Sequence, residues 1–164
     1  MRAILIILTT IILFGCTKDN TNMNSYNLEN QIYLSFKNAN GQNLLDNSTE
    51  NSYNIEAMKL FYLVNDEPVE VTIENGFNMG SIELTSDKLL KVFTNPSSSN
   101  IVEETSEYDV AENIAYLQLS STDTDTIKTH SRTSQNYFLV SKVWYNNELV
   151  WERDNGGIIE ITKE

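Results

Sequence analysis

Residues 137–152 read YFLVSKVWYNNELVWE, and this stretch decides the fold class. Two runs rich in aromatic and β-branched residues flank Asn146-Asn147, and asparagine is one of the residues that two-residue hairpin turns favour. The stretch therefore predicts an antiparallel hairpin with strands at 137–145 and 148–152.

The predicted register gives apolar side chains to both faces of this hairpin. Trp144 is expected opposite Leu149, and Lys142 opposite Trp151. Because side chains alternate along a strand, one face carries Phe138, Val140, Trp144, Leu149 and Trp151. The other face carries Leu139, Val143, Tyr145 and Val150. We expect both tryptophans in the core, where large aromatic side chains dominate burial. The alternative is that Trp144 and Trp151 form an exposed ligand-binding platform that stacks on sugar rings or contacts a partner.

The same pattern of short strands continues through the chain. Ile32, Leu34 and Phe36 alternate with polar residues, as in a half-buried strand. A second hairpin is predicted around Asn65-Asp66, and no segment has the periodicity of a long helix. These features predict an all-β protein, a single antiparallel β-sandwich of the immunoglobulin-like or a related kind over residues 31–164.

The residues before the domain have the features of a secretion signal. Arg2 precedes an apolar run over residues 3–14, which is shorter than the ~20 residues that a membrane-spanning helix needs and suits a signal peptide. We expect residues 1–15 to be a signal peptide and residues 16–30 to be a lipidated N-terminus followed by a flexible tether.

Leu13, Gly15 and Cys16 resemble the lipobox of bacterial lipoproteins, with Phe14 where that family has a small residue. The resemblance implies lipidation of Cys16, the only cysteine of the chain. It also implies anchoring through two or more acyl chains, which hold a protein stably on a membrane. The expected location is the cell envelope, lipid-anchored in the outer membrane.

Longer stretches, such as Tyr116-Leu117-Gln118-Leu119 and Val143-Trp144-Tyr145-Asn146, resemble small uncharacterised lipoproteins of Bacteroidota that contain β-sandwich domains. This resemblance implies a fold and a location and no activity.

The charge balance narrows the class of partner. The chain has 23 acidic and 11 basic side chains, a net charge of −12. A strongly negative surface repels nucleic acid, so no nucleic-acid partner is expected. The partners that remain are the membrane, through the lipid, and an envelope or surface protein or glycan.

The residues that common catalytic and metal sites need are scarce. His130 is the only histidine, and we expect it in a loop, as part of the polar run Thr129–Arg132. A zinc site needs several histidine or cysteine ligands. Asp123 and Asp125 resemble the first ligands of a calcium loop, but the rest of that pattern fails at Ile127. We therefore predict no catalytic residue, no metal and no cofactor.

Two further predictions concern acidic residues. Asp125-Thr126-Ile127 resembles an O-glycosylation sequon of Bacteroidota, which implies modification of Thr126 in a surface loop. Glycoside hydrolysis needs only two carboxyl groups about 5–10 Å apart. The expected function is therefore a non-catalytic, lipid-anchored binding or structural module, and the alternative is a small polysaccharide-acting enzyme with a carboxylate pair.

Overall fold

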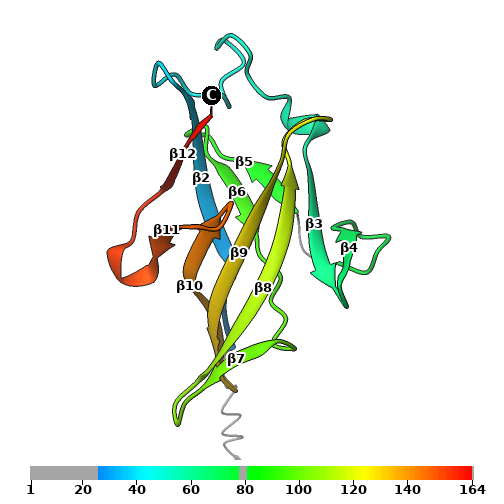
Figure 1. The fold of residues 1–164 in the computed structure, drawn as a ribbon, viewed down its shortest axis with the longest axis vertical. Coiled ribbons are helices and arrows are strands. Elements are labelled where there is room, and N and C mark those ends of the chain that lie inside the picture. Colours follow the sequence, from blue (N-terminus) through cyan, green and yellow to red (C-terminus); the bar gives the residue numbers. More distant parts are fainter. Residues whose placement is uncertain (1–25, 78–80, 164) are drawn as a thin grey trace, which may run out of the picture.

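The computed structural model describes residues 26–77 and 81–163, and within them the chain forms two β-sheets of eight and four strands (Figure 1). The prediction of an all-β fold is confirmed. Two single turns of 3-10 helix, η1 (Ile55–Ala57) and η2 (Arg153–Asn155), interrupt the strands. Over the described ranges, no helix is long and apolar enough to cross a membrane.

The larger sheet has the strand order β1-β10-β9-β8-β3-β4, with β11 beside β10 and β7 beside β8. Its strands are β1 (Asn27–Glu29), β3 (Lys59–Val64), β4 (Glu67–Glu70), β7 (Ile101–Glu104), β8 (Asp109–Gln118), β9 (Thr124–Thr133), β10 (Tyr137–Tyr145) and β11 (Glu148–Glu152).

The smaller sheet has the order β12-β2-β6-β5. Its strands are β2 (Gln31–Asn38), β5 (Ile82–Leu84), β6 (Leu90–Phe93) and β12 (Ile159–Lys163). Most pairings are antiparallel, but β1 lies parallel to β10 and β12 parallel to β2. The expectation of a purely antiparallel arrangement is therefore wrong. Strands far apart in the sequence are free of the hairpin turn that forces neighbours to run in opposite directions.

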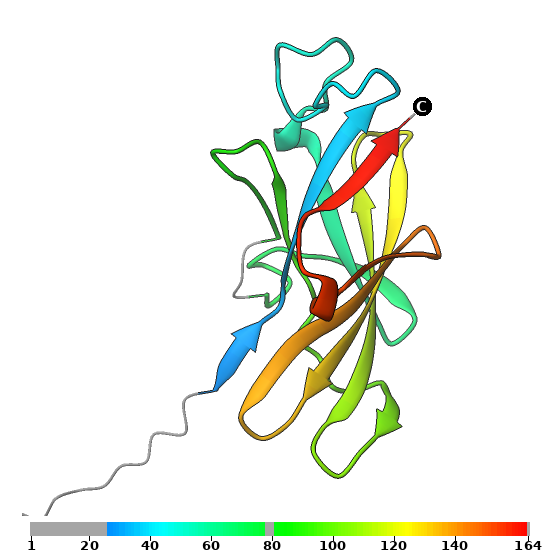
Figure 2. The same ribbon diagram turned by 90° about the vertical axis from the view of Figure 1, so that its left-hand side faces the viewer.

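The two sheets pack face to face around one hydrophobic core (Figure 2). Ile32, Leu34 and Phe36 of β2 are all buried, as their alternation predicts. The larger sheet contributes inward-facing residues from several strands, among them Leu60, Tyr62, Leu117, Ile127, Val140, Val143 and Tyr145.

Both predicted hairpins are confirmed. Asn65 and Asp66 join β3 to β4, and their φ angles are 51° and 66°. Asn146 and Asn147 join β10 to β11, with φ angles of 48° and 70°. Positive φ at both central residues is the geometry of the tight turn that matches the twist of paired strands.

The central strand β9 differs most from the sequence-based expectation. It pairs with β8 along its whole length, Asp109↔Thr133 to Gln118↔Thr124. His130 lies within this strand, so its prediction as a loop residue is wrong. Threonine favours strands because its branched side chain fits a pleated surface, and partner strands on both sides satisfy the backbone of β9.

The ordered sheet begins before Gln31. Strand β1 lies within residues 16–30, the range expected to be a tether, and pairs with the start of β10. The lipidation site predicted at Cys16 lies outside the described residues.

Candidate functional site

The two tryptophans of the C-terminal hairpin lie on opposite faces of the sheet. Trp144 pairs with Leu149, as predicted, but Trp151 pairs with Val143 instead of Lys142. The register shifts because Val150 is an extra residue in β11. A bulge of this kind moves every later side chain to the other face. The prediction that the tryptophans share a face is therefore wrong.

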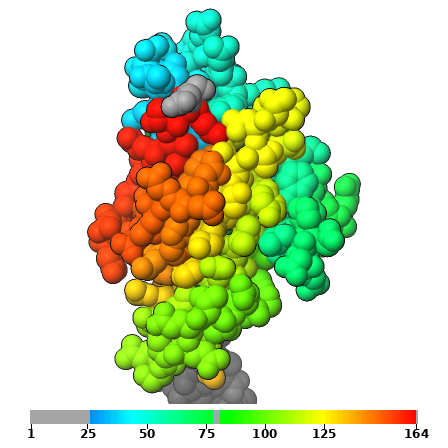
Figure 3. Space-filling view, viewed as in Figure 1, coloured from blue at the N-terminus to red at the C-terminus, as the bar shows by residue number. Residues whose placement is uncertain are grey.

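Trp144 lies on the outer face of the larger sheet, where β8, β9 and β10 are paired side by side. The residues of these three strands form the middle of the surface seen in Figure 3. It is half-buried, so the expectation of a core position is wrong for this residue. The Lys128 ammonium lies 4.4 Å from the centroid of the indole ring, and the His130 ring centroid 4.6 Å. Glu112 Oε2 lies 3.0 Å from His130 Nε2 and 3.6 Å from Lys128 Nζ. The Trp144 ring is thus already packed against neighbours within the chain.

Trp151 is half-buried and packs against the hydrophobic core. We expect Trp151→Ala to lower the free energy of unfolding by about 2 kcal/mol, because the lost side chain leaves a cavity beside the core. Trp144→Ala, on the outer face, should cost less than about 1 kcal/mol. Urea unfolding of both variants measures the difference, and equal losses would contradict the assignment of the two faces.

Asp123 and Asp125, the two acids compared with a calcium loop, share a lysine. Lys163 Nζ of β12 lies 3.0 Å from Asp123 Oδ1 and 2.5 Å from Asp125 Oδ2. The Tyr53 hydroxyl donates to Asp123 Oδ2 at 2.8 Å. The Tyr145 hydroxyl donates to Asp125. The ammonium thus stands between the carboxylates, and the cluster joins the C-terminal strand to the larger sheet.

Thr126 lies in β9, so its expected position in a loop is wrong. It is half-buried, its backbone N–H donates to Asn146 Oδ1 at 2.8 Å, and the preceding Asp125 is buried. Because Asp125 is buried in the folded domain, a glycosylating enzyme that recognises this sequon would have to contact Asp125 before the domain folds. Glycosylation of Thr126 stays a prediction.

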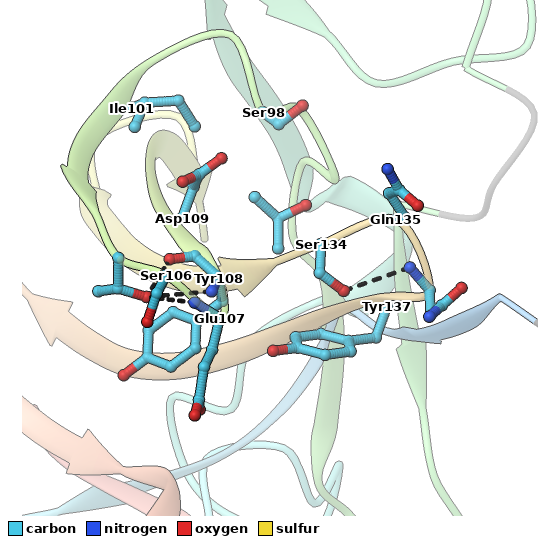
Figure 4. A pocket seen from close by; sticks show the side chains of 12 residues that line it. Ser98, Ile101, Ser106, Glu107, Tyr108, Asp109, Ser134, Gln135 and Tyr137 are labelled. Carbon is cyan, nitrogen blue, oxygen red and sulfur yellow. Dashed lines mark hydrogen bonds between the residues drawn. The ribbon is translucent and has the colours of Figure 1, made fainter.

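A cavity that is open to solvent lies at one end of the larger sheet, between the β7–β8 turn (105–108) and the β9–β10 turn (134–136) (Figure 4). We call it the turn cavity, and its volume is about 790 Å³. Tyr108, Asp109 and Tyr137 line it and are half-buried. Exposed polar residues surround them, namely Ser98, Thr105, Ser106, Glu107, Gln135 and Asn136.

Three of the polar side chains that line the turn cavity have hydrogen-bonding groups available for a ligand. Within residues 26–77 and 81–163, the side chains of Tyr108, Asp109 and Tyr137 form no hydrogen bond or ion pair. The carbon of the Arg132 guanidinium lies 5.2 Å from the centroid of the Tyr108 ring. Convergent polar groups in a cavity of this size are typical of a small-molecule site.

Hydroxyl groups hold both turns of the cavity in place. Thr105 Oγ1 accepts from the Tyr108 N–H at 3.0 Å and donates to the Tyr108 carbonyl at 2.5 Å. In the other turn, Ser134 Oγ accepts from the Asn136 N–H at 3.2 Å. These contacts define the backbone from which Tyr108 and Tyr137 extend.

The sequence does not predict the turn cavity, because no local motif marks it. Tyr108 and Tyr137 are far apart in the chain, and only the pairing of β9 with β8 and β10 brings them together. Thr133 lies opposite both Asp109 and Phe138, which places the two tyrosines beside neighbouring strand ends.

The chain has no match among protein-family models, curated proteins or solved structures.

Proposed function

We propose that this protein is a lipid-anchored lipoprotein of the bacterial outer membrane whose two-sheet domain is a non-catalytic β-sandwich, immunoglobulin-like or related, that binds an envelope or surface protein or glycan. One observation carries the proposal, namely the lipobox-like run at residues 13–16, which lies a short distance in sequence before β1, the first strand of the described residues. Only residues 17–26 separate Cys16 from β1, which begins at Asn27.

The anchor would join the domain at the end that holds the turn cavity. Asn27 pairs with Tyr137, and its N–H donates to the Asn136 carbonyl at 2.8 Å. Ten linking residues that behave as a random coil have an r.m.s. span of roughly 18 Å. The turn cavity would then lie near the membrane surface, and the Asn146-Asn147 turn would point away from it.

The polysaccharide-acting enzyme remains a second candidate because Glu107 and Asp109 line the same cavity. These are the two side-chain types that glycoside hydrolysis uses. The Asp123–Asp125 pair is less suited to this role, since Lys163 already bridges it.

Substitution of the predicted lipidation site tests the anchor. We expect Cys16→Ala to remove the protein from the membrane fraction of a lipoprotein-processing bacterium, because the acyl chains attach to the Cys16 sulfur. Phe14→Ala is the matched control, since it brings the lipobox closer to the family pattern and should leave the protein on the membrane. Mass spectrometry of the N-terminal peptide identifies the acyl groups.

Protease treatment of intact cells then locates the domain. Cleavage without lysis indicates a surface-exposed domain, and cleavage only after lysis indicates a periplasmic one. Cys16→Ala protein that stays in the membrane fraction, or an N-terminal peptide without acyl groups, would contradict the proposal.

A further inference from the structure

We propose that the turn cavity binds a neutral saccharide through Tyr108, Asp109 and Tyr137. The inference rests on the proposed function, in which the two-sheet domain is a binding module, and it names both the site and the class of ligand. The proposed site differs from Trp144 and Trp151, which the sequence offered as an alternative ligand-binding platform.

The contacts that the aromatic side chains already make within the chain favour the turn cavity over Trp144 and Trp151 as the binding site. The Trp144 ring already has Lys128 and His130 against it, and Trp151 packs on the core. The side chains of Tyr108 and Tyr137 both line the turn cavity (Figure 4). A tyrosine presents an apolar ring with a hydroxyl at one end. Two such rings suit a ligand that has an apolar face and a hydroxylated edge, which is the character of a pyranose.

The other cavity residues supply the hydrogen-bonding groups that a sugar needs. Hydroxyl and amide side chains form the rim, and the half-buried Asp109 carboxylate can accept from two sugar hydroxyls. A half-buried carboxylate loses part of its hydration, so a ligand that donates hydrogen bonds to it recovers that interaction. The volume of about 790 Å³ is within the usual range of ligand sites, ~300–1,000 Å³.

The charges around the cavity disfavour an anionic ligand. Glu103, Glu104, Glu107 and Asp109 belong to the β7–β8 hairpin that forms one wall, and they repel anionic sugars and phosphate. The Arg132 guanidinium lies against the Tyr108 ring and offsets part of this negative charge. The two hydroxyl-fixed turns reduce the entropy lost when a ligand binds.

Binding of the full-length chain to immobilised oligosaccharides tests this inference. The protein is kept in a detergent without a sugar headgroup and offered neutral cello-, malto-, xylo-, manno- and chito-oligosaccharides. Oligogalacturonate and oligolysine serve as anionic and cationic probes. We expect binding to at least one neutral oligosaccharide and no binding to oligogalacturonate or oligolysine.

Variants of the cavity show where the sugar binds. We expect Tyr108→Ala and Tyr137→Ala each to weaken binding by about tenfold or more, as the loss of an aromatic anchor commonly does. Ser106→Trp changes an exposed rim residue and should block the cavity without disturbing the core. The matched control is Tyr33→Ala, which removes an exposed tyrosine of β2 in the other sheet. Its affinity should equal that of the native protein.

Two results would overturn the inference, namely failure to bind any neutral probe, or binding that survives both Tyr108→Ala and Ser106→Trp in folded protein. Neither result affects the membrane fractionation that tests the anchor. Conversely, oligosaccharide that is bound in the cavity and cleaved would support the site and contradict the non-catalytic function. Chromatography of the probes after incubation separates these outcomes.

Discussion

Replacing Lys163 by methionine is expected to lower the free energy of unfolding by about 3 kcal/mol, since removal of one partner leaves buried charge uncompensated. The Asp125 side chain is 5% exposed, and its carboxylate faces the Lys163 ammonium at 2.5 Å. Asp123 lies on the same ammonium. Methionine keeps the length of the side chain but leaves both carboxylates without their cation.

The ion pair between Lys37 and Glu160 supplies the control. It also involves the C-terminal strand, since it joins β2 to β12 at 2.6 Å, but its side chains are 35% and 63% exposed. Exposed pairs contribute about 0–1 kcal/mol, because water and salt screen them. Lys37→Met should therefore cost less than about 1 kcal/mol, although the substitution is the same.

Urea unfolding of native protein and both variants measures the two losses. A loss for Lys163→Met as small as that for Lys37→Met would show that the Asp123–Asp125 cluster is solvated and contributes little. Equal slopes of free energy against urea concentration are needed for the comparison, since the slope reports the surface exposed on unfolding.

The parts of the fold that the sequence predicts are those with local causes. Asn65-Asp66 and Asn146-Asn147 mark their hairpins, because the positive φ angles that these turns require favour asparagine and aspartate. The alternation in Ile32, Leu34 and Phe36 likewise predicts the buried face of β2.

The parts that the sequence does not predict depend on distant partners. Strand β9 faces the core with Asp125, Thr129, Ser131 and Thr133, so it lacks the apolar alternation by which strands are usually recognised. The buried Asp125 is tolerated because it accepts from Tyr145 and Lys163. The buried Ser131 hydroxyl has no hydrogen-bond partner within the described residues.

The candidate sites, too, depend on residues that are distant in the sequence, and local patterns therefore do not predict them. The bulge at Val150 separates Trp144 from Trp151, and one extra residue is enough to reverse the faces. The turn cavity needs two turns on neighbouring strand pairs to lie at the same end of the sheet. Turn residues such as Ser134 and Asn136 indicate a loop, but no local pattern indicates which other loop lies beside it.

Alkaline pH is expected to unfold the domain through its buried tyrosines. Burial raises the pKa of Tyr62, and burial together with the hydrogen bond to Asp125 raises the pKa of Tyr145. In the unfolded chain both ionise near the ordinary pKa of about 10. The folded state therefore holds more protons above this pH, so stability from this source is present below pH ~10 and is lost as the pH rises.

The steepness of the loss of stability with pH follows from the number of protons that the folded state holds and the unfolded state releases. Two tyrosines that are neutral when folded and ionised when unfolded lower the stability by about 3 kcal/mol per pH unit. Because native stabilities are about 5–15 kcal/mol, the domain should unfold within a few pH units above this point. Tyrosinate absorbance and near-ultraviolet circular dichroism should change together, since the buried hydroxyls ionise only when packing is lost.

The double variant Tyr62→Phe/Tyr145→Phe separates this mechanism from a general effect of charge. It loses two hydrogen bonds, those to the Phe93 carbonyl and to Asp125, so its stability at neutral pH should fall. Its dependence on alkaline pH should nevertheless be flatter, because the two groups that bind protons in the folded state are gone. Tyr33→Phe, at an exposed position, should leave both quantities unchanged. An unaltered pH dependence in the double variant would show that repulsion among the many carboxylates, rather than tyrosine ionisation, drives alkaline unfolding.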